Sequence, residues 1–131
     1  MLITPLYAAI LALIFFVLSV RTLRARRELR IGIGDAGNPV MLRTMRVHSN
    51  FAEYAPFTLL LILLMELMEA PALLVHLLCG CLLVGRVSHA YGVSNPTENH
   101  TYRVSGMAMT FTALVGSAVC LLGLYAWRLL L

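Results

Sequence analysis

Lysine is absent from this sequence of 131 residues, and charged residues of both signs make up only 12% of it. A soluble domain typically has about 25% charged residues, so this content excludes an ordinary soluble domain. Hydrophobic residues account for 60% of the chain. The length is enough for one domain. The composition therefore predicts an integral membrane protein with a single domain at residues 1–131, in contact with the lipid bilayer.

The net charge of +4 comes from ten arginines, and five of them lie within Arg21–Arg30, directly after an apolar run. A basic cluster beside a membrane span is typical of a cytoplasmic anchor to anionic lipid. We therefore interpret the positive charge as a membrane-surface feature and expect no nucleic-acid partner. No A-x-A-like cleavage site follows the apolar run Leu2–Val20, which indicates a retained signal anchor.

Cysteine and histidine are too sparse to indicate a disulfide framework or a metal site. Cys79 and Cys81 lie two residues apart in an apolar run, so on a helix they point about 200° apart, and Cys120 lies in another such run. We interpret all three as small buried hydrophobic residues. The four histidines have no metal-ligand spacing, and the sequence contains neither a Ser-His-Asp arrangement nor a glycine-rich phosphate loop.

Four long apolar segments are separated by short stretches rich in turn residues. A helix needs about 20 residues to cross a bilayer, and each segment is long enough. The segments are Leu2 to about Leu29, about Val40 to Met68 or Glu69, about Ala72–Gly92, and about Glu98–Arg128 with Thr97 as a candidate N-cap. The chain has no internal repeat, which argues against a transporter. The sequence therefore predicts an all-α bundle of four transmembrane helices.

The arginines are distributed unevenly among the three connections. Seven of the ten surround the first connection and Arg103 adjoins the third, whereas the second connection holds Glu66 and Glu69 and no arginine. The positive-inside rule places the first and third connections in the cytoplasm and both termini outside. Arg128, near the C-terminus, is the arginine that departs from this pattern.

The second segment carries charged residues at the depth of a membrane span, in the pattern R-x-H-x-N-x-x-E-Y-x-P that begins at Arg46. At 3.6 residues per turn, Arg46, Asn50 and Glu53 fall on one helix face. An Arg or Glu at the centre of a span costs about 3 kcal/mol on insertion scales, so such residues usually face a protein interior, a partner or a site.

Polar residues on the third and fourth segments lie toward the same membrane face. Arg86 and His89 are three residues apart on the third segment, Tyr91 follows them, and Arg103 lies near the start of the fourth. Arginine forms forked hydrogen bonds with carboxylates, and glutamate pairs with an ammonium group. The combined set therefore suits an anionic ligand with several carboxylates.

Several of these residues also have a structural interpretation. Arg43 could extend to lipid headgroups. Glu53 could form an ion pair with Arg46 or Arg86 that fixes the helix register. His89 could cap a backbone carbonyl.

Three motifs occur in order on the last three segments: the pattern from Arg46, then Gly85-Arg86-x-x-His89, then Arg103-x-x-Gly106. Together they resemble the MAPEG family, the membrane-associated proteins in eicosanoid and glutathione metabolism. The similarity extends over nearly the whole chain. The stretch G-x-G-D-x-G-N-P from Gly32 resembles the small bacterial members, which implies a multi-pass protein of the inner membrane.

The resemblance implies a four-helix bundle that forms a homotrimer and binds glutathione between subunits near the cytoplasmic face. By motif matching, the glutathione-contacting residues are Arg46, Asn50, Glu53, Arg86, His89, Tyr91 and, on the first helix, Arg24 or a neighbour in its cluster. Arg103 matches an arginine that helps to activate the thiol in catalytic members. Ser49 stands where several glutathione-using members carry a second arginine.

The implied activity is that of a glutathione transferase or peroxidase acting on lipophilic electrophiles that arrive from the bilayer. Arg103 near the glutathione sulfur would favour the thiolate by stabilising its negative charge. The alternative is a non-catalytic membrane scaffold or lipid-binding trimer in which the polar residues serve assembly and the site is vestigial. Glutathione binding distinguishes the two.

Overall fold

The protein is an all-helical bundle in the computed structural model, which describes residues 1–94, 97 and 99–130. Its helices are α1 (Thr4–Leu29), α2 (Pro39–Leu67), α3 (Ala72–Ser94) and α4 (His100–Leu129). Each of the four is long and apolar enough to cross a membrane, and no strand occurs in the described residues. The prediction of an all-α protein with four transmembrane helices is confirmed.

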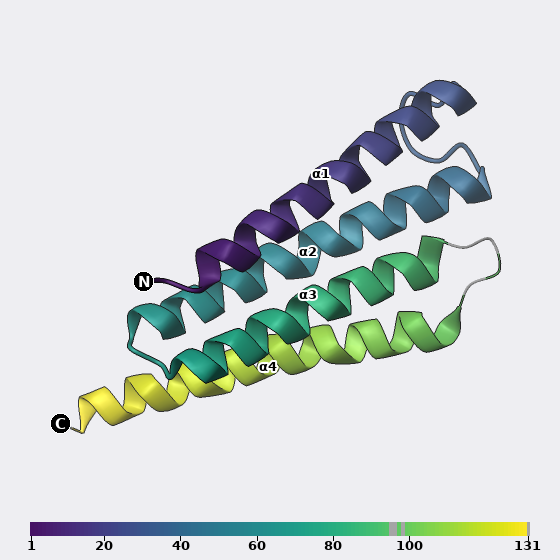
Figure 1. The fold of residues 1–131 in the computed structure, drawn as a ribbon. Coiled ribbons are helices and arrows are strands. Elements are labelled where there is room, and N and C mark those ends of the chain that lie inside the picture. The colour runs from purple at the N-terminus through teal and green to yellow at the C-terminus, as the bar shows by residue number, and fades with distance from the viewer. Residues whose placement is uncertain (95–96, 98, 131) are drawn as a thin grey trace.

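Consecutive helices run in opposite directions along a common bundle (Figure 1). The end of α1 and the start of α2 lie at the same end of the bundle as the end of α3 and the start of α4, and both chain termini lie at the opposite end. We call the first the Arg-rich end, because it carries the cluster Arg21–Arg30, and the second the terminal end. The arginines expected on one membrane face are therefore gathered at one end of the fold.

Side-chain caps determine where α2 and α4 begin. The Asn38 side chain accepts hydrogen bonds from the backbone N–H groups of Val40 and Met41 at 2.9 and 3.1 Å, so α2 starts at Pro39. The cap of α4 is Asn99, which accepts from the N–H of Tyr102 at 3.3 Å. Asparagine is among the preferred N-cap residues because its oxygen reaches the exposed N–H groups of the first turn.

Around the third connection the helix ends differ from the sequence prediction. Thr97 is not the N-cap of α4, because Asn99 lies three residues before Tyr102 and reaches its N–H group instead. Helix α3 continues to Ser94, two residues beyond the predicted end, and the Ser94 hydroxyl donates to the carbonyl of Ala90 one turn back. The predicted start of the fourth segment at Glu98 lies outside the described residues.

Helices α3 and α4 approach closely because glycines face each other across their contact. An ideal Cβ placed on Gly106 would lie 2.5 Å from the backbone nitrogen of His89 and 2.7 Å from the carbonyl oxygen of Gly85. One placed on Gly92 would lie 2.6 Å from the backbone nitrogen of Arg103. Small residues let helix backbones approach in membranes, where apolar burial gives little driving force. This contact brings the Arg-rich ends of α3 and α4 together.

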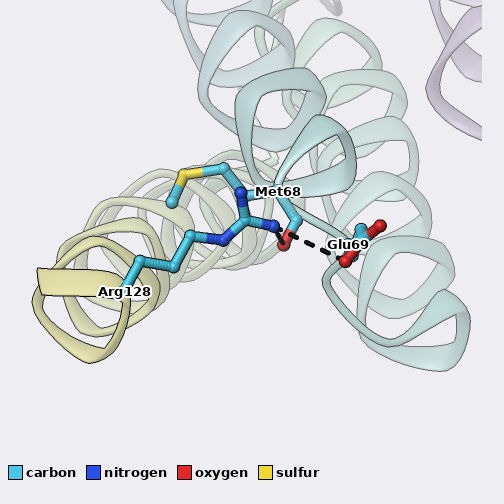
Figure 2. Close-up of polar contacts among 3 residues, drawn as sticks. All are labelled: Met68, Glu69 and Arg128. Atoms are coloured by element: carbon cyan, nitrogen blue, oxygen red, sulfur yellow. Dashed lines mark hydrogen bonds and ion pairs between the residues drawn. The ribbon is translucent and has the colours of Figure 1, made fainter. Parts of the chain in front are cut away.

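At the terminal end, two acidic residues of α2 and its connection hold neighbouring elements. The Glu66 carboxylate accepts from the backbone N–H groups of Ile3 and of Thr4, the latter at 2.9 Å, at the start of α1. Arg128 donates to the carbonyl of Met68 at 3.1 Å and lies 3.6 Å from the Glu69 carboxylate (Figure 2). Arg128, which departed from the arginine pattern, thus has partners at this end, although an exposed ion pair contributes little stability.

Candidate functional site

A polar pocket of about 250 Å³ lies at the Arg-rich end, where α2, α3 and α4 meet. Its lining residues are Pro39, Leu42, Arg43, Arg46, Asn50, His89, Val93 and Arg103. Four of the residues predicted from sequence to bind or activate glutathione are among them. These four come from three helices and are separated by up to 57 residues in the chain, so only the folded bundle brings them together.

Helix α2 contributes most of the residues that line the pocket. Arg43, Arg46 and Asn50 lie at i, i+3 and i+7, which places them on neighbouring turns of one face. Arg43 donates a hydrogen bond to the carbonyl of Val93 at 3.3 Å. That bond ties the start of α2 to the last turn of α3, so Arg43 has a protein partner in addition to the headgroup contact expected from sequence.

Arg86 lies beneath the pocket and not on its surface, with 1% of its area exposed. Its guanidinium group donates to the Thr110 hydroxyl at 2.9 Å, to the Asn50 side-chain oxygen at 2.7 Å, and to the sulfur of Met107 at 3.2 Å. The group also lies 5.6 Å from the centre of the Tyr54 ring. A buried arginine that loses a partner is strongly destabilising, so Arg86 links α2, α3 and α4 and supports the pocket from below.

The contact with Arg86 fixes the orientation of the Asn50 amide. Arginine has only donors, so the atom of Asn50 that faces Arg86 must be the oxygen. The NH₂ group of Asn50 therefore remains as the donor on the pocket side. His89 is 7% exposed and lines the same pocket. Its ring makes no hydrogen bond within the described residues, so the cap on a backbone carbonyl that sequence allowed is not formed there.

Besides Arg86, three of the predicted ligand residues lie outside this pocket. Glu53 is exposed on α2, and within the described part of the chain it forms no ion pair with Arg46 or Arg86. Tyr91 is exposed and packs edge-to-face against Tyr102, with ring centres 5.3 Å apart.

Arg24 belongs to a separate groove of about 600 Å³ between α1 and α2, together with Arg21 and Glu28. One chain therefore presents the predicted ligand residues on two surfaces, one on α2–α4 and the other on α1–α2.

A pocket with three arginines, an amide donor and an imidazole attracts anions. Forked hydrogen bonds from arginine to carboxylates are short and about twice as strong as neutral ones, and the low dielectric of a membrane protein interior strengthens each charge contact. Within the described residues no group of three or more His, Cys, Asp or Glu side chains could hold a metal ion. The arrangement can bind a flexible molecule with several carboxylates and stabilise a further negative charge on it.

The contact between Ser19 and His48 was among those not predicted from sequence. The Ser19 hydroxyl on α1 lies 3.0 Å from Nε2 of His48, and the His48 ring stacks on Phe15 at 4.8 Å between ring centres. His48 belongs to the motif on α2, but its partner is 29 residues away and only the α1–α2 pairing shows it. A serine inside an otherwise apolar span was the sequence signal that could have found it.

Comparison with known proteins gives matches over nearly the whole chain. The family model described as "MAPEG family" matches residues 4–123. The chain is 34% identical over 128 residues to "Inner membrane protein YecN" of Escherichia coli strain K12, which covers 97% of this chain and 95% of that protein. The protein of the same name from Escherichia coli O6:H1 strain CFT073 matches equally. No solved structure gives a significant match.

The match spans all four helices and both polar surfaces of the fold. The four candidate spans and the inner-membrane relative agree with the predicted location, so the chain is a multi-pass protein of the inner membrane. With the family model covering residues 4–123 and the relative covering almost the full length, the chain belongs to the MAPEG family.

Proposed function

We propose that this protein is a glutathione-dependent transferase or peroxidase that acts on lipophilic electrophiles. The observation that carries the proposal is the convergence of Arg46, Asn50, His89 and Arg103 on one pocket at the Arg-rich end. Glutathione has two carboxylates, an ammonium group and a thiol. The arginines and the Asn50 amide suit the carboxylates, and Arg103 is the residue that family resemblance assigns to the thiol.

The chemistry follows from charge. A free thiol is mostly protonated at neutral pH, and only the thiolate is a strong nucleophile. A guanidinium group beside the sulfur lowers the pKa of the bound thiol. In conjugation, the thiolate sulfur forms a bond to an electrophilic carbon, and the electron pair of the bond that breaks leaves with the departing group or takes up a proton. The protein supplies positioning and charge stabilisation.

The proposal includes a homotrimer in which two surfaces of neighbouring chains complete one site. On one chain, Glu53 and Arg24 lie away from the pocket that holds Arg103. Glu53 also lies on an exposed stripe of α2 that continues through Phe57 and Leu60. A carboxylate at the depth of a span favours a protein partner over lipid, and a second copy placed against this stripe would provide one.

The assembly can be tested by crosslinking between copies. With the native cysteines replaced by serine, Leu60→Cys should form crosslinks between chains in the membrane, because the stripe on α2 faces its copies. Leu122→Cys is the matched control, since Leu122 is equally apolar and more exposed but lies on α4. Native mass spectrometry should give the mass of three chains. A monomer, or equal crosslinking at both positions, would contradict the assembly.

Glutathione binding tests the function directly. Calorimetry on protein purified in detergent should show binding, and Glu53→Gln should weaken it about ten- to a hundredfold, as expected for loss of a hydrogen bond between charged groups. Glu69→Gln makes the same chemical change at the terminal end, where Glu69 pairs with Arg128, and should leave the affinity unchanged. Absence of binding in the unmodified protein would refute the proposed cofactor.

A non-catalytic scaffold is the second candidate, and the buried Arg86 favours it. All the contacts of its guanidinium group are within the bundle, so one residue of the family motif serves packing. If the protein is a scaffold, the pocket arginines serve assembly, as Arg86 serves packing. Substitutions at Arg46 and Glu53 should then reduce the content of trimer and leave the ionisation of a bound thiol unchanged.

A further inference from the structure

A third cavity, of about 410 Å³, also lies between α1 and α2 and is lined almost entirely by apolar atoms. Four alanines hollow it out: Ala8 and Ala12 from α1, and Ala52 and Ala55 from α2. Phe15 and Phe51 line its end toward the Arg-rich end, with ring centres 5.9 Å apart. None of the residues lining the polar pocket lines this groove, so it is a separate feature of the fold.

A hydrogen-bonded pair of polar side chains lies directly beyond the two phenylalanines. His48 stacks on Phe15, and Ser19 lies one helical turn beyond Phe15 on the same face of α1. The groove itself is apolar, and the polar pair lies just beyond its end. A molecule with an apolar chain and a polar group at one end of it would match this arrangement.

The hydroxyl proton of Ser19 determines what His48 can bind. Ser19 donates to the carbonyl of Phe15 at 2.9 Å, as serines in helices often do. A serine has one proton to donate, so the contact at 3.0 Å to His48 requires Nε2–H of His48 to be the donor. In the neutral ring Nδ1 then carries a lone pair, and within the described residues it has no partner. It can accept a hydrogen bond from a ligand.

The groove and the polar pair beyond it are together about as long as one lipid chain. From Ala8 to Ser19 is eleven residues along α1, or about 16 Å at the helical rise. The hydrocarbon of one leaflet is about 15 Å thick, half of the bilayer core. A single acyl chain lying in the groove would place its first carbons at Phe15 and its polar group beside Ser19 and His48.

A positively charged residue, Arg26, lies beyond Ser19 on the same face of α1. Arg26 is seven residues beyond Ser19, two turns nearer the Arg-rich end. It is held there by hydrogen bonds to the carbonyls of Gly32 and Gly34 at 3.3 and 3.1 Å. A phosphate attached next to the polar group would extend toward this charge, which attracts anionic headgroups.

We propose that the alanine-lined groove between α1 and α2 binds a monoacyl phospholipid. Its acyl chain lies against the alanines and the two phenylalanines, its free glycerol hydroxyl donates to Nδ1 of His48, and its phosphate extends toward Arg26. A monoacyl lipid has one chain and a hydroxyl group next to it, whereas a diacyl lipid has two chains and no such donor. This site does not depend on glutathione binding.

The test uses purified full-length protein and palmitoyl lysophosphatidylethanolamine with a photoreactive diazirine in its chain. Labelled peptides should come from α1 between Ala8 and Phe15 and from α2 between Phe51 and Leu59. Ala52→Phe fills the groove and should reduce labelling at least tenfold. Ala9→Phe adds the same ring to the neighbouring exposed position of α1, which does not line the groove, and should leave labelling unchanged.

The role of His48 is tested with a second ligand. An analogue whose free glycerol hydroxyl is methylated should bind about two- to tenfold more weakly than the parent lipid, as expected for loss of one neutral hydrogen bond. His48→Leu should remove this difference and leave the analogue's binding nearly unchanged. Equal binding of the two lipids by the unmodified protein, or equally tight binding of a diacyl lipid, would overturn the proposal. So would crosslinking of an Ala52→Cys chain to a second copy, because protein would then cover the groove.

Discussion

Replacing Gly106 by alanine is expected to force α3 and α4 apart and to remove the polar pocket. The new Cβ would lie 2.5 Å from the backbone nitrogen of His89 and 2.9 Å from its Cα. Backbone atoms cannot rotate away as a side chain can, so the helices themselves must shift. Overpacking of this kind costs on the order of 3 kcal/mol, and we expect it to show as a large fall in thermal stability in detergent.

The matched control is Gly123→Ala, on the same helix. A Cβ on Gly123 meets nothing within 4 Å, and alanine has a higher helix propensity than glycine by about 1 kcal/mol. Gly123→Ala should therefore keep or raise the melting temperature. Glutathione binding measured on the fraction of Gly106→Ala that remains folded should also fall, because His89 and Arg103 lie on the two helices that separate. A Gly106→Ala protein as stable as the control would show that α3 and α4 pack differently.

The helices could be predicted closely from sequence because each span is marked at both ends. Arg30 and Asn38 bracket the first connection with chemistry that ends one helix and starts the next: Arg30 adopts a left-handed conformation with φ 54°, and Asn38 caps α2. The third connection was predicted less well. Both Thr97 and Asn99 are residue types that cap helices, and local sequence does not decide between them.

The candidate site could be predicted only in part, because helical periodicity gives the face of a residue but not its neighbour. Arg86 and His89 are three residues apart and were both predicted to line the cleft. In the fold His89 lines the pocket, whereas Arg86 reaches beneath it to Thr110 on α4. The difference depends on how closely Gly85 and Gly106 allow the two helices to approach, which is a tertiary property. The same limit applies to Ser19, whose partner is on another helix.

The other large effect is expected at Arg103, which lines the polar pocket from the start of α4. If glutathione binds there as a thiolate, the complex should show thiolate absorbance in the ultraviolet near neutral pH. Arg103→Leu should abolish this band while much of the binding remains, because the other pocket residues still hold the carboxylates. Loss of a hydrogen bond to a charged group is worth about 1.5–3 kcal/mol, which is about ten- to a hundredfold in the equilibrium between thiol and thiolate.

The comparison with Glu53→Gln makes this result specific. Glu53 is proposed to pair with the ligand ammonium, so Glu53→Gln should weaken binding and leave the thiolate band of the bound fraction intact. Arg103→Leu should do the reverse. Arg103→Lys is the intermediate case, since it keeps the charge but loses the planar fork, and it should retain part of the band. If the unmodified protein binds glutathione without a thiolate band, and both substitutions reduce binding equally, the arginine serves structure and the catalytic proposal fails.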